Sequence, residues 1–364
     1  MKILILQDFL RNGGTERQSC LLANAFAEAG HGVALLTFRP GGALDSMPST
    51  RVERIILQSR DLGWDWFAPR LTHTARAWEP HVFLCMGRMA NCYGERLAAA
   101  IPRARVIATL RTGKSLPWLF RRSLRRVAHV VANSEESRRL LVSVHRIAKE
   151  RTSVIHNALV FPPEAHEASA AGEAGPAIAL REGVGADTLV LLCVGMFRPE
   201  KNQRELIEIA SQLPREASWQ LWFVGEGATR RQCEELAARK GLSQRIRFFG
   251  FQENPAALYR AADVAVLAST SESLSNFLIE AHAYGLPSIA YEVTGVHECG
   301  GIVVPRDNRD AFLAQVSRFI TDREALKTES RRVRSHALAH FSPQRQTTAF
   351  LELFARLRTP ASSR

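Results

Sequence analysis

The 364-residue sequence contains no apolar run of 18 residues, so we expect no helix that spans a membrane. Its six cysteines show no C-x-x-C spacing, which argues against a zinc site and against a disulfide framework. The chain passes directly from Met1-Lys2 into an apolar strand, without the cleavage region of a signal peptide. These absences predict a reduced cytoplasmic protein whose cysteines are small buried residues.

Lysine is scarce, with six residues among the 48 Lys and Arg, yet the formal net charge is +12. Residues 101–151 hold thirteen Lys or Arg against three Glu, a patch able to meet nucleic acid, an anionic membrane or a phosphorylated substrate. Within it, Trp118, Leu119 and Phe120 precede four arginines, which fits an interfacial helix on anionic lipid and equally a sheet-packing helix with a solvated basic face. No nucleic-acid module surrounds the patch, so we expect no nucleic-acid partner.

The length and two series of alternating strands and helices predict an α/β protein with two doubly wound, Rossmann-like domains. The stretch from Pro162 to Gly185 is rich in Ala, Gly, Glu and Pro and has the composition of a linker. We therefore expect a first domain over residues 1–165, a linker over 166–186, a second domain over 187–340 and a final helix over 341–364.

In the first domain, a strand over residues 2–7 leads to Gly13-Gly14 and to a helix whose start has capping-box residues Thr15 and Gln18. The pattern is not G-x-G-x-x-G and no acidic residue ends the second strand, which disfavours a dinucleotide site. An ordinary glycine turn is the alternative. Arg111 follows the strand over 106–110, where open α/β sheets bind ligands, although a solvated arginine is also an option.

In the second domain, Gly195 ends a buried strand, and Arg198 and Lys201 come just before a helix that begins at Gln203. A glycine at a strand end with cations ahead of a helix start is a sound arrangement for binding phosphate. A lysine alone would be an ordinary surface residue.

The stretch from Ser269 to Pro287 follows a buried strand and organises the second domain. Ser273, Ser275 and Asn276 are available to cap a helix that Gly285 ends. Glu272 then lies on the loop and Glu280 in the first turns of the helix, so both carboxylates can face one small volume beside exposed backbone N–H groups. Such a site suits a sugar nucleotide, because helix N-termini bind diphosphates and carboxylates accept hydrogen bonds from hydroxyls. On spacing alone, the two glutamates would be a coincidence.

The sequence Glu272-x7-Glu280, continued as Ala281-His-Ala-Tyr-Gly-Leu-Pro287, closely resembles the C-terminal signature of the family 4 retaining glycosyltransferases of group 1 type. The resemblance covers nearly the whole chain and is strongest from Leu189 to Asp307. Two positions depart from the family. Met196 stands where the family has an arginine, for which Arg198 is the obvious substitute, and Arg111 stands near the position of a family histidine.

The resemblance implies the GT-B fold, two Rossmann-like domains facing across a cleft, and transfer of a hexosyl group from a nucleotide sugar with retention of configuration. It implies the following roles. The catalytic residues are Glu272, Arg198 and Lys201, and the donor-binding residues are Gly195, Arg198, Lys201, Phe249, Gly250, Phe251, Glu272, Ser275, Asn276, Phe277 and Glu280. The acceptor or phosphate loop comprises Gly13, Gly14, Glu16 and Arg111.

No Asp-x-Asp pair occurs, so neither a metal nor another cofactor is implied. The expected partners are a UDP, GDP or ADP sugar and a saccharide or lipid-linked saccharide of bacterial surface polysaccharide, such as lipopolysaccharide. Contact with an anionic membrane would place the protein at the inner face of the cell membrane. A nucleotide-sugar epimerase or phosphorylase on the same fold and a non-catalytic protein that binds anionic surfaces remain alternatives.

Overall fold

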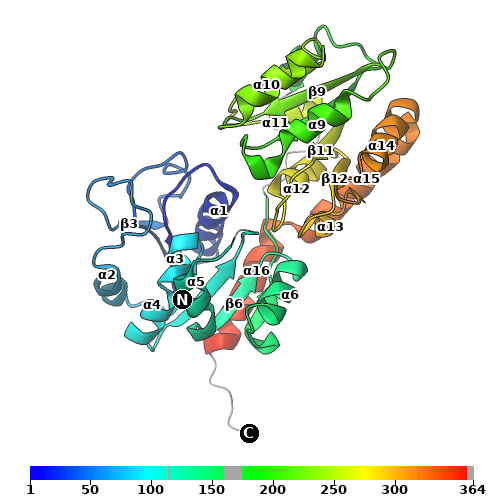
Figure 1. Ribbon diagram of the computed structural model, residues 1–364. Helices are drawn as coiled ribbons and strands as arrows, with labels where there is room; N and C mark the ends of the chain where they lie inside the picture. Colours follow the sequence, from blue (N-terminus) through cyan, green and yellow to red (C-terminus); the bar gives the residue numbers. More distant parts are fainter. Residues whose placement is uncertain (114, 160–173, 359–364) are drawn as a thin grey trace. The chain divides into compact units, whose positions relative to one another are not determined.

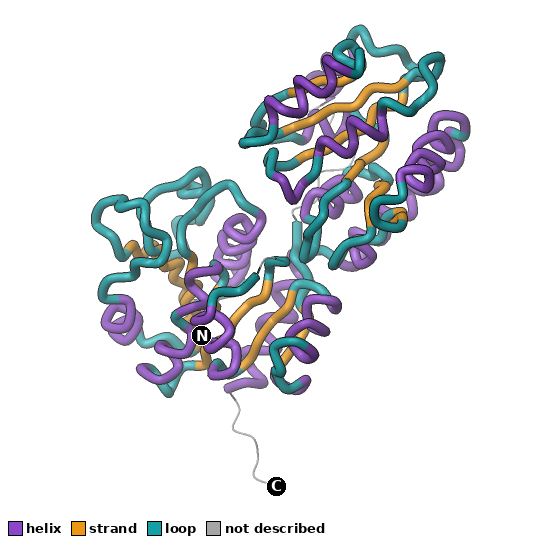
Figure 2. The backbone as a smooth tube through the Cα atoms, in the orientation of Figure 1, coloured by secondary structure: helices purple, strands orange, loops and turns teal. Residues whose placement is uncertain are grey.

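The computed structural model describes residues 1–113, 115–159 and 174–358. The chain forms two compact units: unit 1 comprises Met1–Ala158 with Pro343–Arg364, and unit 2 comprises Leu159–Ser342 (Figure 1). Each unit is a parallel sheet with helices packed around it (Figure 2). In the part of the chain that is described, no helix is long and apolar enough to cross a membrane.

Unit 1 contains a seven-stranded parallel sheet in the order β3-β2-β1-β4-β5-β6-β7. Its inner strands are runs of Leu, Ile and Val with almost no exposed side chain, as expected for strands covered on both faces. The strands are β1 (Lys2–Gln7), β2 (Gly32–Thr37), β3 (Glu53–Ile56), β4 (Val82–Cys85), β5 (Arg105–Leu110), β6 (His129–Ala132) and β7 (Thr152–Val154).

The helices of unit 1 cover this sheet and include the last helix of the chain. They are α1 (Gly14–Glu28), α2 (Leu71–Trp78), α3 (Arg88–Cys92), α4 (Gly94–Ala100), α5 (Trp118–Arg126), α6 (Glu135–Ser143), the 3-10 turn η1 (Lys149–Arg151) and α16 (Pro343–Arg358). The ring of Phe26 on α1 packs against Phe350 and Phe354 of α16, with centroids 6.1 and 5.5 Å away. Aromatic packing therefore joins the C-terminal helix to the first β-α-β segment.

The predicted capping box at the start of α1 is wrong. The helix begins one residue earlier, with Gly13 as an N-cap that makes no side-chain bond. The amide of Gln18 is buried and exchanges two hydrogen bonds with the backbone of Ala158, where it also meets Gln346. A buried amide must satisfy its own donors and acceptor, and here backbone from the end of the unit does so in place of the helix start.

Unit 2 contains a six-stranded parallel sheet in the order β10-β9-β8-β11-β12-β13. Its strands are β8 (Leu189–Val194), β9 (Trp219–Val224), β10 (Ile246–Phe248), β11 (Val264–Leu267), β12 (Ser288–Tyr291) and β13 (Ile302–Val304). The helices are α8 (Ala174–Arg181), the 3-10 turn η2 (Pro199–Lys201), α9 (Gln203–Ala210), α10 (Arg230–Arg239), α11 (Ala256–Ala261), α12 (Asn276–Ala283), α13 (Val296–Cys299), α14 (Arg309–Thr321) and α15 (Arg323–His340).

The prediction of a linker over 166–186 needs correction at its C-terminal end, while residues 166–173 lie outside the described part. Helix α8 forms there and packs on α11. Arg181 donates to the carbonyl of Ala261 at 2.6 Å and forms an ion pair with Asp263 at 2.7 Å. Alanine, which is frequent in this stretch, also has the highest helix propensity. The helix that forms packs on α11 and is therefore part of unit 2.

Each sheet has one point at which the order of the strands reverses. In unit 1 this point lies between the neighbouring strands β1 and β4, from which successive strands are added toward opposite edges of the sheet. In unit 2 it lies between β8 and β11. In open parallel sheets, ligands bind outside the carboxyl ends of the strands at this point. The loops after these four strands are therefore where a site is expected.

Candidate functional site

In unit 2, the loops after the neighbouring strands β8 and β11 are joined to each other. The Thr270 amide donates to the carbonyl of Glu200 at 2.9 Å. Beside this bond, Lys201 Nζ donates to Glu272 Oε1 at 2.7 Å, with side chains that are 27% and 10% exposed. Both residues were predicted from the sequence as site residues, and the structure brings them into one half-buried ion pair at the switch point.

Helix α12 begins immediately after this pair. Ser275 is its N-cap and accepts from the Leu278 amide at 3.4 Å, which confirms the predicted cap. Glu280 lies in the second turn, and its Oε2 accepts from the Tyr259 hydroxyl at 2.7 Å. Burial, followed by the charge of Glu280, raises the pKa of Tyr259 well above its usual 10, so this hydroxyl remains a donor at every ordinary pH.

The two residues that follow this cap are Asn276 and Phe277. Asn276 is the first residue of α12. The Phe277 ring is buried and stacks on Tyr259 with centroids 6.3 Å apart. The side chain of Phe277 therefore supports the helix start, and only its backbone remains for a ligand.

Three strand-end glycines lie side by side at the carboxyl edge of this sheet. The Gly225 amide donates to Gly250 at 2.7 Å, and a Cβ on Gly225 would lie 2.2 Å from the carbonyl oxygen of Gly195. Gly225 has φ +136°, which only glycine adopts readily. A Cβ on Gly195 itself would meet no atom within 4 Å. The space beside Gly195 is thus open to a ligand.

Phe249 and Phe251, both predicted as donor-binding residues, have different surroundings. Phe249 packs on Trp222 with centroids 5.3 Å apart and carries the Arg247 guanidinium 4.9 Å over its ring. Phe251, two residues on, is 53% exposed. Phe249 therefore builds the edge of the sheet, and Phe251 presents a free aromatic face beyond Gly250.

Arg198, the predicted substitute for the family arginine, lies exposed at the start of η2. Its Nη2 is 3.1 Å from the sulfur of Met196, the residue that occupies the family's arginine position. Among the described residues, no carboxylate forms an ion pair with Arg198. Its charge is therefore not neutralised by a neighbour in this part of the chain.

In unit 1, the loop after β1 carries the predicted glycines. Gly13 precedes α1 and Gly14 begins it, and a Cβ on Gly13 would lie 2.3 Å from Glu16 Oε2. Glycine at this position therefore lets the Glu16 carboxylate fold over the start of the helix. The first backbone N–H groups of α1, which have no acceptor within the helix itself, lie at the end of the same loop.

Asp8, which sequence reasoning missed, directly follows β1 and lies beside this loop. Its carboxylate accepts from the amides of Met89 at 3.0 Å and Ala90 at 2.5 Å, at the start of α3. Burial outweighs these two bonds and raises the pKa of Asp8 to about 7. An acidic residue directly after the first strand was the available signal.

Arg111 ends β5 and is held by Asn157, whose Oδ1 accepts from Nη1. Nε and Nη2 of Arg111 are buried, and in the described part of the chain neither has a hydrogen-bond partner. Burial lowers the pKa of Arg111 to about 10, so it is still a cation at neutral pH. Two buried donors without acceptors are costly, and a bound oxygen ligand would satisfy them. Asn157 was not predicted, although it follows a strand.

The basic and aromatic stretch forms α5, which packs within unit 1. Phe120 and Leu124 are buried, and the helix packs on α3 and α4. Trp118 and Leu119 are 61% and 51% exposed. Arg122 bonds Glu95 at 2.5 Å. The helix thus packs in unit 1 and also presents an exposed apolar and basic face.

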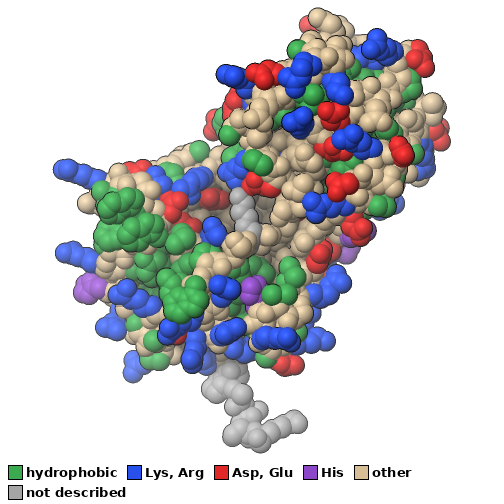
Figure 3. Space-filling model, viewed as in Figure 1, with side chains coloured by type: hydrophobic (Ala, Val, Ile, Leu, Met, Phe, Trp, Pro, Cys, Tyr) green, Lys and Arg blue, Asp and Glu red, His purple; other side chains and the backbone are tan. Residues whose placement is uncertain are grey.

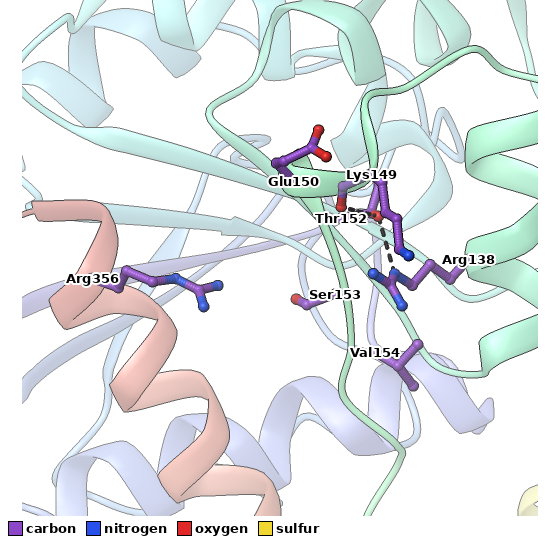
Figure 4. A pocket seen from close by; sticks show the side chains of 7 residues that line it. All are labelled: Arg138, Lys149, Glu150, Thr152, Ser153, Val154 and Arg356. Atoms are coloured by element: carbon purple, nitrogen blue, oxygen red, sulfur yellow. Dashed lines mark hydrogen bonds between the residues drawn. The ribbon is translucent and has the colours of Figure 1, made fainter. Parts of the chain in front are cut away.

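A pocket of about 500 Å³ lies in unit 1 beside the edge strand β7, and none of the predicted residues lines it (Figure 4). Arg138 points to Thr152, to which it donates at 3.1 Å, and Arg356 reaches toward the pocket from α16 (Figure 4). The remaining lining residues are Lys149, Glu150, Ser153 and Val154. This pocket is separate from the strand-end residues described above.

The cysteines are all free and buried, as predicted. In the described residues, no group of three or more His, Cys, Asp or Glu could hold a metal ion. In unit 2, the groups at the carboxyl ends of the strands include the cations of Arg198 and Lys201, backbone amides and the separate carboxylates of Glu272 and Glu280.

Two parallel Rossmann-like sheets with these strand-end loops define the GT-B class of glycosyltransferase folds. Anabaena HepE in complex with UDP-glucose has this fold, with a TM-score of 0.81, 21% identity and coverage of 98% of this chain and 100% of that one. The lipopolysaccharide biosynthesis glycosyltransferase WaaG gives a TM-score of 0.71 at 16% identity, covering 96% and 99% of the two chains.

The sequence itself matches two family models, Glycosyltransferase Family 4 over residues 12–159 and Glycosyl transferases group 1 over residues 188–322. The chain belongs to the family 4, group 1 glycosyltransferases. The lipopolysaccharide core biosynthesis glycosyltransferase LpsE of Rhizobium meliloti is 29% identical over 175 residues, 47% of this chain and 51% of LpsE. The D-inositol 3-phosphate glycosyltransferase of Geodermatophilus obscurus is 30% identical over 296 residues, 75% and 60% of the two chains. The matches thus span about half to three fifths of these relatives.

Proposed function

We propose that this protein is a retaining glycosyltransferase that moves a hexosyl group from a nucleoside diphosphate sugar to a hydroxyl of a saccharide acceptor. The observation that carries the proposal is the Lys201–Glu272 ion pair at the switch point of unit 2, beside the capped start of α12 and Glu280. A cation, a helix N-terminus and two carboxylates match the diphosphate and the hydroxyls of such a donor.

The difficult part of this reaction is the negative charge that develops on the departing diphosphate. Lys201 has three N–H donors, so it can keep its bond to Glu272 and still contact a phosphate oxygen. Arg198, which no described carboxylate neutralises, and the backbone amides at the start of α12 supply further donors. Each fixed donor of this kind contributes about 3–4 kcal/mol to a transition state. These groups provide the required stabilisation without a metal or another cofactor.

The two glutamates divide the recognition of the sugars. In the proposal, Glu280, oriented by Tyr259, accepts from the ribose hydroxyls, and Glu272, oriented by Lys201, accepts from the hexose hydroxyls. With Glu272 engaged in this way, no protein nucleophile is needed. An oxygen of the leaving phosphate takes the proton of the acceptor hydroxyl on the face that it departs from, and the anomeric configuration is retained.

The donor is proposed to be a UDP-sugar. Support comes from the fold of HepE, a protein solved with UDP and with UDP-glucose. Phe251, exposed beyond Gly250, provides a flat apolar surface suited to a nucleobase.

The acceptor is proposed to be a lipid-linked saccharide of a bacterial surface polysaccharide, held by unit 1. Support comes from the two donors of Arg111 that have no partner among the described residues, from the helix start at Gly13-Gly14, whose N-cap makes no side-chain bond, and from the relatives named for lipopolysaccharide core biosynthesis. The exposed Trp118, Leu119 and arginines of α5 favour peripheral contact with anionic lipid at the inner face of the cell membrane.

Radiolabelled UDP-hexoses incubated with the protein and with extracted lipid-linked saccharides test the proposal. We expect label in the lipid phase, an α-linked product from an α-linked donor by NMR, and loss of transfer in Glu272→Ala. Product that forms only with added phosphate would indicate a phosphorylase. A changed hexose without any acceptor would indicate an epimerase. No turnover of any nucleotide sugar would contradict the proposal.

A further inference from the structure

Two tryptophans stand exposed on the segment between β3 and α2 of unit 1. Trp64 and Trp66 are 50% and 55% exposed, and their rings are stacked with centroids 5.7 Å apart and planes inclined by 13°. Hydrophobic side chains gather on the surface over this segment (Figure 3). A soluble domain gains stability by burying such large rings, so a pair left outside points to a role in binding.

The segment is built to hold these rings in place. The side chain of Gln58 is buried, and its amide donates to the carbonyls of Trp64 at 2.9 Å and Phe67 at 2.7 Å. The hydroxyl of Tyr93, which lies between α3 and α4, donates to the carbonyl of Trp66 at 2.5 Å. The Phe67 ring packs edge-on against both indoles, at 5.9 and 6.0 Å. Rings fixed in this way lose little conformational entropy when a ligand binds.

Asp65, between the two tryptophans, ties them to the strand-end loops. It forms ion pairs with Arg39, which follows β2, and with Arg11 on the loop that contains Gly13. Arg39 also holds Asp61 through two bonds of 2.8 and 2.9 Å. The exposed rings therefore border polar side chains at the same edge of the sheet as the proposed acceptor loop.

We propose that Trp64 and Trp66 form an aromatic platform that binds a pyranose ring of the acceptor saccharide. This inference rests on the proposed function and names a recognition surface for its acceptor. A pyranose has an apolar face of C–H groups and a rim of hydroxyls. The flat indoles cover the apolar face, and the carboxylates and guanidiniums of the neighbouring network offer acceptors and donors for the rim.

The charges around the platform favour a saccharide over a membrane. Asp61 and Asp65 are balanced by Arg11 and Arg39, so the ion-pair network beside the rings is neutral. Anionic lipid attracts basic surfaces, and on this unit α5 provides such a surface with four arginines. The platform is therefore assigned to the saccharide part of the acceptor.

Saturation-transfer NMR tests the platform with methyl glycosides of glucose, galactose, mannose and N-acetylglucosamine, and with a delipidated lipopolysaccharide core oligosaccharide. The proteins are the wild type, a Trp64→Ala/Trp66→Ala double variant and Trp118→Ala, an equally exposed tryptophan of the same unit. We expect transfer from aromatic protons to the C–H groups of at least one saccharide, with affinity about tenfold weaker in the double variant and unchanged in Trp118→Ala.

Two results would overturn the platform: no transfer to any saccharide in the wild type, or equal transfer in the double variant. Quenching of Trp64 and Trp66 by brominated lipids in phosphatidylglycerol vesicles, without a saccharide signal, would assign the rings to a membrane instead. The thermal shift with UDP separates this inference from the proposed function. If UDP raises the melting temperature of wild type and double variant equally, the donor site is intact, and the saccharide result tests the platform alone. If UDP does not raise the melting temperature of wild type, the result contradicts the proposed function instead.

Discussion

Lys201 Nζ and Glu272 Oε1 lie 2.7 Å apart, although 71 residues separate them in the chain. The sheet order brings them together, because β8 and β11 are neighbours and the loop after each strand emerges at the same edge. The pair is only slightly exposed, and each side chain limits the rotation of the other. A donor would thus meet a cation and a carboxylate that are already in position.

Replacing Lys201 tests whether this cation stabilises the leaving diphosphate. In Lys201→Ala we expect kcat/KM for the nucleotide sugar to fall about 10²–10³-fold, the usual effect of removing one fixed donor to developing charge. Lys240→Ala is the matched control, because Lys240 forms a comparable ion pair with Glu208 in the same unit, at 2.8 Å. Steady-state kinetics that show equal losses in both variants would contradict a specific role of Lys201.

Glu280 should set the preference for ribose. We expect wild type to bind UDP about tenfold or more tightly than 2′-deoxy-UDP, because a charged acceptor bond contributes about 1.5–3 kcal/mol. Glu280→Gln should largely remove the difference, as measured by titration calorimetry. Tyr259→Phe keeps the carboxylate and removes only one hydrogen bond to it, so the preference should persist. An unchanged preference in Glu280→Gln would place the ribose elsewhere.

Two glycines allow ligand contact to be separated from folding. Gly195→Ala places a methyl group in open space, so the melting temperature should hold while donor affinity falls through a steric clash with the ligand. Gly225→Ala forces a side chain to φ +136° and against the Gly195 carbonyl, and should cost stability by at least about 1–3 kcal/mol. Thermal unfolding and UDP binding of both variants check this. Full donor affinity in Gly195→Ala would argue against approach of the diphosphate at that glycine.

We expect Arg111 to contribute to acceptor binding and to lower the stability of the folded protein. Arg111→Met removes a buried cation, two of whose donors have no partner among the described residues, so the melting temperature should not fall, whereas acceptor turnover should drop about a hundredfold. Binding of UDP, which the proposal assigns to unit 2, should be unaffected. A variant that loses stability and keeps acceptor turnover would show that the arginine is structural.

His282 makes the stability of unit 2 depend on pH. It is buried on α12 between Cys299 and Ser288, and burial lowers its pKa from 6.5 to about 4. A depressed histidine pKa means that the unfolded chain takes up the proton first, so stability is complete above pH 6.5 and is lost as the pH falls toward 4. At pH 5 the loss from this group is about 2 kcal/mol.

Urea unfolding at pH 7 and pH 5 measures this loss, and His282→Gln should reduce it. The difference between the two proteins isolates His282 from Asp8, whose raised pKa of about 7 acts in the opposite direction as the pH changes. The same pH dependence in both proteins would exclude His282 as the cause.

Local chemistry explains which parts of the site could be predicted. The polar turn with Ser275 and the Gly285 stop determine α12 within a few residues, so the sequence alone predicts its cap correctly. The glycine ends of the strands are likewise local features. Two parallel sheets followed from long buried strands alternating with helices.

Other features depend on contacts that no local pattern contains. The Lys201–Glu272 bond requires the adjacency of β8 and β11, and the pairing of Arg111 with Asn157 requires that β5, β6 and β7 lie in sequence. Gln18 does not form the predicted capping box, because its side-chain amide bonds to Ala158 and Gln346 instead. The stacking and exposure of Trp64 and Trp66 depend on how Gln58, Phe67 and Tyr93 hold their segment, so this arrangement became visible only in three dimensions.

The central claim is that unit 2 binds a nucleoside diphosphate through Lys201 and Glu280. Thermal unfolding with UDP, GDP, ADP and their hexose conjugates, on wild type and on Lys201→Ala and Glu280→Ala, tests it most directly. At a hundred times its dissociation constant, a ligand adds about 2.7 kcal/mol of stability. We predict that a uridine ligand stabilises wild type by this amount and that the same concentration stabilises each variant by about half as much or less. No shift of the folded wild type with any nucleotide would contradict the account.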